Sequence, residues 1–174
     1  LYRFDELMPA ATADQSSHSK QWRRTRLPAV ATDSIHAKPG PITSIAIDPA
    51  DPTGNALYIT LGGIDNPQRV WYFDGTVWQP RSGPQTASDE ATISLLNVQH
   101  NALVVDPQNP NHLYVAADIG VWRSVDQGES WQIFSRGLPD AAVVDLKLHA
   151  PGRLLRAATH GRGVYEFDLG RPQR

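Results

Sequence analysis

The sequence predicts an all-β protein of the β-propeller type, because one pattern of short strands occurs three times along its 174 residues, with four strands in the first two copies and three in the last. Two markers recur about 50–60 residues apart, as expected of four-stranded antiparallel blades with insertions. An Asp-Pro pair stands at Asp48 and again at Asp106, and a tryptophan stands at Trp78 and again at Trp131. No segment has a long 3.6-residue apolar period with helix caps, so only Leu95–Val98 is expected to form a short helical turn.

Each strand of the repeat follows from its own composition. The first strand is nearly all apolar, which indicates an inner strand covered on both sides. An Asp-Pro turn follows, because proline presets the turn dihedral and cannot donate to a β-ladder. The second strand carries a Leu-Tyr pair, the third begins with valine and an aromatic residue, and the fourth begins at the tryptophan marker. The first strands are predicted at Ile45–Ile47, Leu103–Val105 and Val144–Leu148, and the third strands begin at Val70, Val121 and Val164.

About three blades are too few for a comfortable closed ring, because the terminal blades would leave a face and an edge uncovered. Two interpretations are open: the chain is part of a longer propeller, or a second copy completes the ring. The N-terminal part contains two segments that resemble outer strands, Leu1–Asp5 and Gln21–Arg24. The predicted parts are therefore a half blade with a polar insertion and linker (1–41), a blade (42–81), an inter-blade loop (82–99), a second blade (100–139), and a three-stranded last blade with a tail (140–174).

The turn before the fourth strand of the second repeat has the form Ser-x-Asp-x-Gly-x-Ser-Trp. Its fixed positions are Ser124, Asp126, Gly128, Ser130 and Trp131. The aspartate can accept backbone N–H groups, the glycine supplies a positive φ, and the tryptophan can bury its ring between blades. This pattern resembles the Asp-box, or bacterial neuraminidase repeat, of sialidase-, xyloglucanase- and sortilin-like propellers. The resemblance implies a structural role for these five residues and, for the protein, an exported location in a bacterium: extracellular, periplasmic or on the cell surface.

The loops between the second and third strands of a propeller share one end of the blades, together with the inter-blade loops. Convergent polar groups at that end predict a surface that binds a protein or a glycan. The alternative is that these side chains are ordinary solvated loop residues. The predicted binding residues are Asp65, Arg69, Asp118, His160 and Arg162, with Asp89 and Glu90 of the inter-blade loop nearby.

Two other functions remain as alternatives. The segment Ala117–Arg123 resembles the part of xyloglucanase-type glycosidases that holds a catalytic aspartate, so Asp118 is a candidate catalyst. Hydrolysis of a glycosidic bond needs a second carboxylate, which would come from Asp65, Asp89 or another part of the chain. A sialidase-like arginine motif is only faintly present at Arg26. The third possibility is a purely structural domain of a large exported protein.

Composition excludes several classes of function. With 16 basic and 18 acidic residues and a net charge of −2, there is no global electrostatic attraction to nucleic acid or to an anionic membrane. No apolar run reaches the roughly 18 residues of a membrane span. The chain has no cysteine, its six histidines lack close metal-ligand spacing, and no phosphate-binding or dinucleotide-binding motif occurs. We therefore expect no metal and no cofactor.

Overall fold

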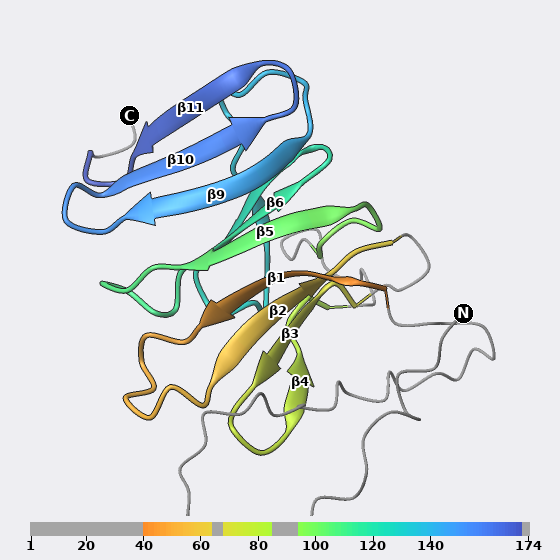
Figure 1. Cartoon of the computed structure of the whole chain (residues 1–174), viewed down its shortest axis with the longest axis vertical. Coiled ribbons are helices and arrows are strands. Elements are labelled where there is room, and N and C mark those ends of the chain that lie inside the picture. Colours follow the sequence, from red (N-terminus) through yellow and green to blue (C-terminus); the bar gives the residue numbers. More distant parts are fainter. Residues whose placement is uncertain (1–39, 64–67, 85–93, 172–174) are drawn as a thin grey trace, which may run out of the picture.

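The computed structural model describes residues 40–63, 68–84 and 94–171, and every regular element in these ranges is a β-strand. The strands form three antiparallel sheets, each ordered as in the sequence, that stack side by side (Figure 1). The predicted fold class is confirmed: this is a partial β-propeller. Blade 1 contains β1 (Ile42–Ile47), β2 (Leu57–Leu61), β3 (Val70–Phe73) and β4 (Trp78–Pro80); blade 2 contains β5 (His100–Val105), β6 (Leu113–Ala117), β7 (Gly120–Ser124) and β8 (Gln132–Ile133); blade 3 contains β9 (Val143–His149), β10 (Leu154–Thr159) and β11 (Gly163–Asp168).

The hydrophobic core lies in the seams between blades. In the first seam, Tyr58 and Val70 of blade 1 pack in one buried cluster with Leu103, Val115 and Trp122 of blade 2. The second seam repeats this arrangement one blade further, with Tyr114 and Val121 of blade 2 against Leu146 and Leu155 of blade 3. Alternation of side chains along the strands explains both clusters, because a strand of a middle blade presents one set of residues to each neighbour.

The first strands lie next to one another, β1 beside β5 and β5 beside β9. The expectation that they are covered on both sides is wrong for β1. Ile45 and Ile47 are 62% and 55% exposed, because they face away from blade 2, toward which Ala46 packs. An apolar first strand therefore marks the inner position in a blade rather than complete burial.

The turn from Ser124 to Trp131 is held by the side chains that turn chemistry requires. The Asp126 carboxylate accepts the Ser130 backbone N–H at 2.9 Å and the Ser130 hydroxyl, while the Ser124 Oγ accepts the Gly128 N–H at 2.8 Å. Trp131 is fully buried and donates its indole Nε1–H to the Arg81 carbonyl of blade 1 at 2.8 Å. The tryptophan precedes β8, so that strand begins one residue later than the predicted position.

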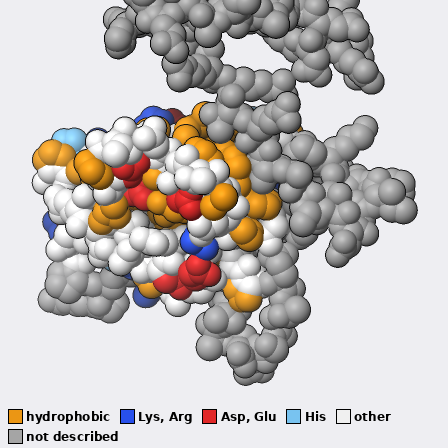
Figure 2. Space-filling view, turned by 90° about the horizontal axis from the view of Figure 1, so that it is seen from below, with side chains coloured by type: hydrophobic (Ala, Val, Ile, Leu, Met, Phe, Trp, Pro, Cys, Tyr) orange, Lys and Arg blue, Asp and Glu red, His pale blue; other side chains and the backbone are white. Residues whose placement is uncertain are grey.

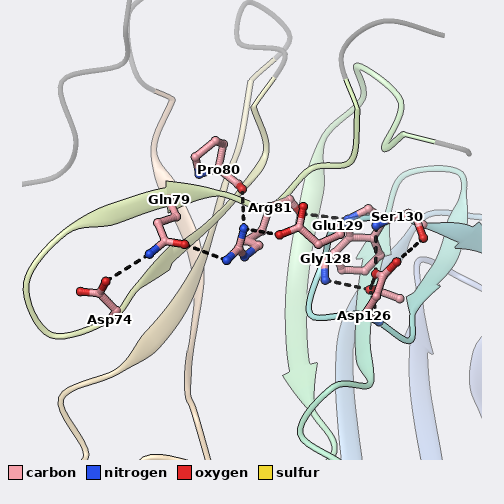
Figure 3. A network of polar contacts seen from close by, with 10 residues as sticks. Asp74, Gln79, Pro80, Arg81, Asp126, Gly128, Glu129 and Ser130 are labelled. Atoms are coloured by element: carbon pink, nitrogen blue, oxygen red, sulfur yellow. Dashed lines mark hydrogen bonds and ion pairs between the residues drawn. The ribbon is translucent and has the colours of Figure 1, made fainter. Parts of the chain in front are cut away.

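Gly128 meets two requirements at once. Its φ is +88°, and a Cβ built there would lie 2.7 Å from the Arg81 carbonyl oxygen. The turn thus sits directly against the end of blade 1. A chain of polar contacts strengthens this junction: Asp74 accepts from Gln79, which accepts from Arg81, which reaches Glu129 of blade 2 at 2.6 Å (Figure 3).

The segment Leu95–Val98 does not form the expected helical turn. Leu95 donates its N–H to the Ser82 carbonyl and buries its side chain in the first seam, while Val98 donates to the Leu96 carbonyl only two residues away. Packing of Leu95 between two blades, rather than the local preference of the segment, decides its conformation. The half-blade segments Leu1–Asp5 and Gln21–Arg24 lie outside the described residues. Among those residues that are described, no helix is long and apolar enough to cross a membrane.

Candidate binding surface at the loop end

The three blades end in equivalent rim positions on the same side. The residue after the second strand donates its backbone N–H to a carbonyl just before the first strand of its own blade. These bonds join Gly62 to Pro41 at 2.8 Å, Asp118 to Gln99 at 3.1 Å and His160 to Ala142 at 2.8 Å. Asp118 and His160 therefore occupy corresponding positions of adjacent blades, and both are exposed.

Asn101 ties the rim of blade 2 to blade 3. Its side-chain amide donates to the Asp118 carboxylate at 3.1 Å and to the Val143 carbonyl at 2.9 Å. The amide thereby orients the carboxylate toward the rim while fixing the start of β9. Arg162, in the loop between β10 and β11 of blade 3, is exposed.

A groove with a volume of about 420 Å³ runs along the first strands of all three blades, away from this rim. Its walls include the exposed Ile45 and Ile47 of β1 and the ion pair between Lys147 and Asp145 of β9, whose charged atoms are 3.1 Å apart. Seen from the side of blade 1, hydrophobic side chains reach the surface next to acidic ones (Figure 2). Apolar and acidic groups are thus both accessible on the outer face of blade 1.

Arg69 differs from its prediction. The expectation that it reaches the exposed rim is wrong, because its side chain is fully buried. Its guanidinium bonds the Asn97 side-chain oxygen, and its backbone N–H donates to the Ser82 Oγ at 2.7 Å. Arg69 immediately precedes β3, where packing against the inter-blade segment draws the side chain into the seam. The Arg69 side chain therefore belongs to the seam between blades and not to the exposed rim.

His100 is a buried neighbour that the sequence analysis missed. Its ring Nδ1 lies 2.8 Å from the Val98 carbonyl, and the residue is fully buried. Burial lowers the pKa of His100 to about 4, assisted by the positive charge of Arg69 and opposed by the Val98 carbonyl and by Asp118. The charges of Arg69 and Asp118 therefore act on this buried ring in opposite directions. The only signal in the sequence was a polar His-Asn pair immediately before an apolar strand.

The structure thus places three of the predicted binding residues, Asp118, His160 and Arg162, in exposed loops at one end of adjacent blades. Asp65, Asp89 and Glu90 lie outside the described residues. The turn containing Asp126 lies at the opposite end of blade 2, where Gln127 donates its N–H to Asn111 in the turn between the first two strands. Within the described ranges, no group of three or more histidine or acidic residues is arranged to hold a metal ion.

Comparisons with known proteins bear on the fold. No family model and no curated protein matches this sequence. Its structure is similar to the GH74 xyloglucanase from Xanthomonas campestris (TM-score 0.52, 20% identity, 76% of this chain and 24% of that chain). It is also similar to an ancestral GH74 enzyme (TM-score 0.51, 22% identity, 76% and 19%) and to the GH74 enzyme of Niastella koreensis (TM-score 0.51, 16% identity, 73% and 21%). The chain spans a quarter or less of these proteins, and identities this low establish the propeller-like fold alone.

Proposed function

We propose that this chain is a non-enzymatic binding module that recognises a protein or a glycan at the loop end of its blades. The observation that carries the proposal is the repeated rim geometry, in which backbone hydrogen bonds hold Asp118 and His160 at equivalent positions of adjacent blades. A preorganised rim costs little conformational entropy on binding, because its backbone is already fixed.

The side chains offer complementary chemistry over a short stretch of surface. Asp118 supplies an acceptor, Arg162 a cationic donor and His160 a group that can donate or accept. The half-exposed Ile119, which follows Asp118 in the chain, adds an apolar side chain. Hydroxyl groups of a glycan, or a polar peptide with one apolar side chain, would match this combination.

The described contacts hold Asp118 as a positioned hydrogen-bond acceptor. Its carboxylate accepts from the Asn101 amide, and its backbone N–H donates to the Gln99 carbonyl. A glycosidase flanks the scissile bond with two carboxyl groups. The resemblance of Ala117–Arg123 to a xyloglucanase segment keeps a portion of a glycoside hydrolase as the second candidate, with Asp118 as its catalyst.

Calorimetric titration with xyloglucan oligosaccharides, and selection of displayed random peptides on the immobilised chain, would test the proposal. We expect saturable binding without turnover, weakened at least about tenfold in Arg162→Ala and His160→Ala, as expected for losing a charge-assisted hydrogen bond. Arg156→Ala is the matched control, because this arginine is exposed on the same blade but in the middle of β10. Release of product sugars that disappears in Asp118→Asn would instead establish the hydrolase. Binding that neither rim substitution changes would show that the surface is wrong.

We also infer that the ring is completed by the rest of a longer propeller or by a second copy, and that the module acts outside the bacterial cytoplasm. Uncovered apolar positions on blade 1, such as Ile45, support the first inference. The Asp-box-like turn supports the second. Light scattering coupled to size exclusion tests whether a second copy completes the ring, because a dimer would have twice the 19.1 kDa mass of one chain.

A further inference from the structure

Both complete blades place a tryptophan, at or immediately before the start of the fourth strand, on equivalent positions of the second and third strands. In blade 2, Trp131 packs in one cluster with Leu113, Val115 and Trp122. In blade 1, Trp78 packs against a cluster that includes Ile59 and Trp71, which correspond in register to Val115 and Trp122. The tryptophan is therefore a regular component of a finished blade.

Blade 3 has a hollow at the equivalent place, with a volume of about 160 Å³. Its strand register identifies the walls. Leu155 lies opposite Leu148 and Phe167, as Leu113 lies opposite Val105 and Ser124; Ala157 and Tyr165 pair as Val115 and Trp122 do. These blade 3 residues thus correspond to the three neighbours of Trp131. We call this hollow the indole socket; it is lined by Val121, Phe134, Leu138, Leu155, Ala157 and Tyr165.

The blade 2 wall of the socket matches the blade 1 wall around Trp131. Arg81 donates its N–H to the Val70 carbonyl at 2.8 Å, and Phe134 donates to the Val121 carbonyl at 2.7 Å. The serine that follows each of them then bonds the same valine backbone: Ser82 to Val70, and Ser135 to Val121. The Phe134 carbonyl consequently occupies the position from which the Arg81 carbonyl accepts the Trp131 indole N–H.

Leu95 and Leu138 complete this correspondence. Leu95 donates to the Ser82 carbonyl at 3.0 Å, and Leu138 donates to the Ser135 carbonyl at 2.9 Å. The former packs against Trp131 in the first seam, and the latter lines the socket. The socket therefore has the shape, the apolar lining and the hydrogen-bond acceptor that hold an indole ring one blade earlier.

The strand that would carry such an indole has a place to pair. Within the described ranges, β11 is paired on one side only, with β10, and it forms the edge of blade 3 (Figure 1). An edge strand presents backbone N–H and C=O groups to which a further strand can add. Socket and edge together define a docking site for an extended segment that begins with tryptophan.

We propose that Trp22 of this chain fills the indole socket, on a strand formed by Gln21–Arg24 that pairs with β11. The chain has five tryptophans, and the other four belong to blades 1 and 2. Trp22 is followed by a polar residue, as are Trp78 and Trp131.

The register of the complete blades predicts the pairing. In blade 1 Trp78 lies opposite Phe73, and in blade 2 Gln132 lies opposite Arg123. The equivalent pairs are Trp22 with Phe167, and Arg23 with Glu166. The first repeats the ring contact of Phe73 and Trp78, whose centroids are 5.0 Å apart, and the second brings opposite charges together across the strands.

The length and direction of the chain allow the strand that carries Trp22 to come from the same molecule as β11. A strand antiparallel to β11 would end at the loop end of blade 3, and Gly40 lies beside Gly62 at the loop end of blade 1. The 15 residues 25–39 between them span at most about 50 Å when extended. Crossing two sheet separations needs about 20 Å. A tethered strand also has a higher effective concentration than one from another copy.

Engineered disulfides in the full-length chain would test this, since it has no cysteine of its own. In Arg23→Cys/Glu166→Cys, the proposed register brings the two Cα atoms within disulfide range. We expect rapid oxidation to a species of monomer mass with faster migration on a non-reducing gel. The matched control is Arg23→Cys/Lys147→Cys, because Lys147 is exposed on the first strand of the same blade, away from the free edge of β11.

Equal yields for the two cysteine pairs would overturn the proposal, and a product of dimer mass would overturn its assignment to the same chain. As a second measurement, Trp22→Ala should lower the urea midpoint of unfolding, and Trp22→Phe should lower it less because it keeps a ring in the socket. An unchanged midpoint in Trp22→Ala would contradict the proposal. Asp118, His160 and Arg162 do not line the socket, and the disulfide yield and the urea midpoint do not depend on ligand binding, so these outcomes can be told apart from those of the proposed binding function.

Discussion

The ion pair between Arg153 and Asp106 offers the sharpest test of how adjacent blades are held together. The Arg153 guanidinium donates two parallel hydrogen bonds, of 2.7 and 2.6 Å, to the two carboxylate oxygens of Asp106. The Asp106 side chain is fully buried, and that of Arg153 is 23% exposed. Asp106 begins the turn after β5 and Arg153 precedes β10, so the pair joins blade 2 to blade 3.

Arg153→Ala would leave the buried carboxylate without its counter-ion. Breaking a buried pair in this way costs 3–5 kcal/mol, and because the Arg153 side chain is partly solvated we expect about 3 kcal/mol here. Arg156→Ala is the matched control on the same blade: its 2.8 Å pair with Glu166 is about half exposed on both sides. Such an exposed pair contributes less than about 1 kcal/mol.

Urea unfolding followed by tryptophan fluorescence measures the difference. With a slope of about 2 kcal/mol per molar urea, Arg153→Ala should move the midpoint by about 1.5 M and Arg156→Ala by less than about 0.5 M. Equal shifts for the two variants would refute the inference that the bidentate pair stabilises the seam.

Acid adds a second readout of the same pair. Burial alone would raise the pKa of Asp106, but hydrogen bonds from Arg153 and from backbone N–H groups outweigh burial and lower it. A lowered pKa contributes stability that is present above the unfolded value of about 4 and is lost as the pH falls through the folded value. The gap between wild type and Arg153→Ala should therefore narrow below about pH 4. A gap that stays constant would contradict this account.

Three further predictions concern the first seam. Trp131→Ala should destabilise the protein by about 3–5 kcal/mol through loss of the buried ring, whereas Trp131→Phe should cost less because it chiefly removes the hydrogen bond to Arg81; urea midpoints decide this. Gly128→Ala should prevent close contact of blades 1 and 2 and lower Tm by more than Gly54→Ala, since both glycines have positive φ but only Gly128 has a backbone oxygen within 2.7 Å of the added Cβ. Because the pKa of His100 is about 4 in the folded protein and about 6.5 in the unfolded chain, protonation favours the unfolded chain, and the free energy of unfolding should fall by about 3 kcal/mol as the pH falls from 6.5 to 4. His100→Gln should flatten that part of the stability curve measured by urea titration at each pH; an unchanged slope would contradict the assignment.

Some features of this protein follow from the sequence because their causes are local. The Asp-Pro turns, the paired Leu-Tyr strands and the Ser124–Trp131 turn all depend on residues within a few positions of one another. Asp126, for example, bonds Ser130 and Ser124, as its place in the motif predicts. The number of sheets and the inner position of the apolar strands were predictable for the same reason.

Other features depend on which blades face each other, and only the tertiary structure decided them. Arg69 is a charged residue next to a predicted loop, which favours a place on the exposed rim. The inter-blade segment that contains Asn97 packs over it, however, and its side chain is buried. Leu95 does not take part in the helical turn that its local sequence favours, because its side chain is buried in the seam between blades 1 and 2. The partner of the Trp131 indole is a backbone carbonyl 50 residues earlier, so no local pattern could identify it. Burial and pairing across seams are set by long-range contacts, whereas turn chemistry is set by short-range ones, and this is why the sequence determined the blades of this protein while the structure decided which polar residues reach its surface.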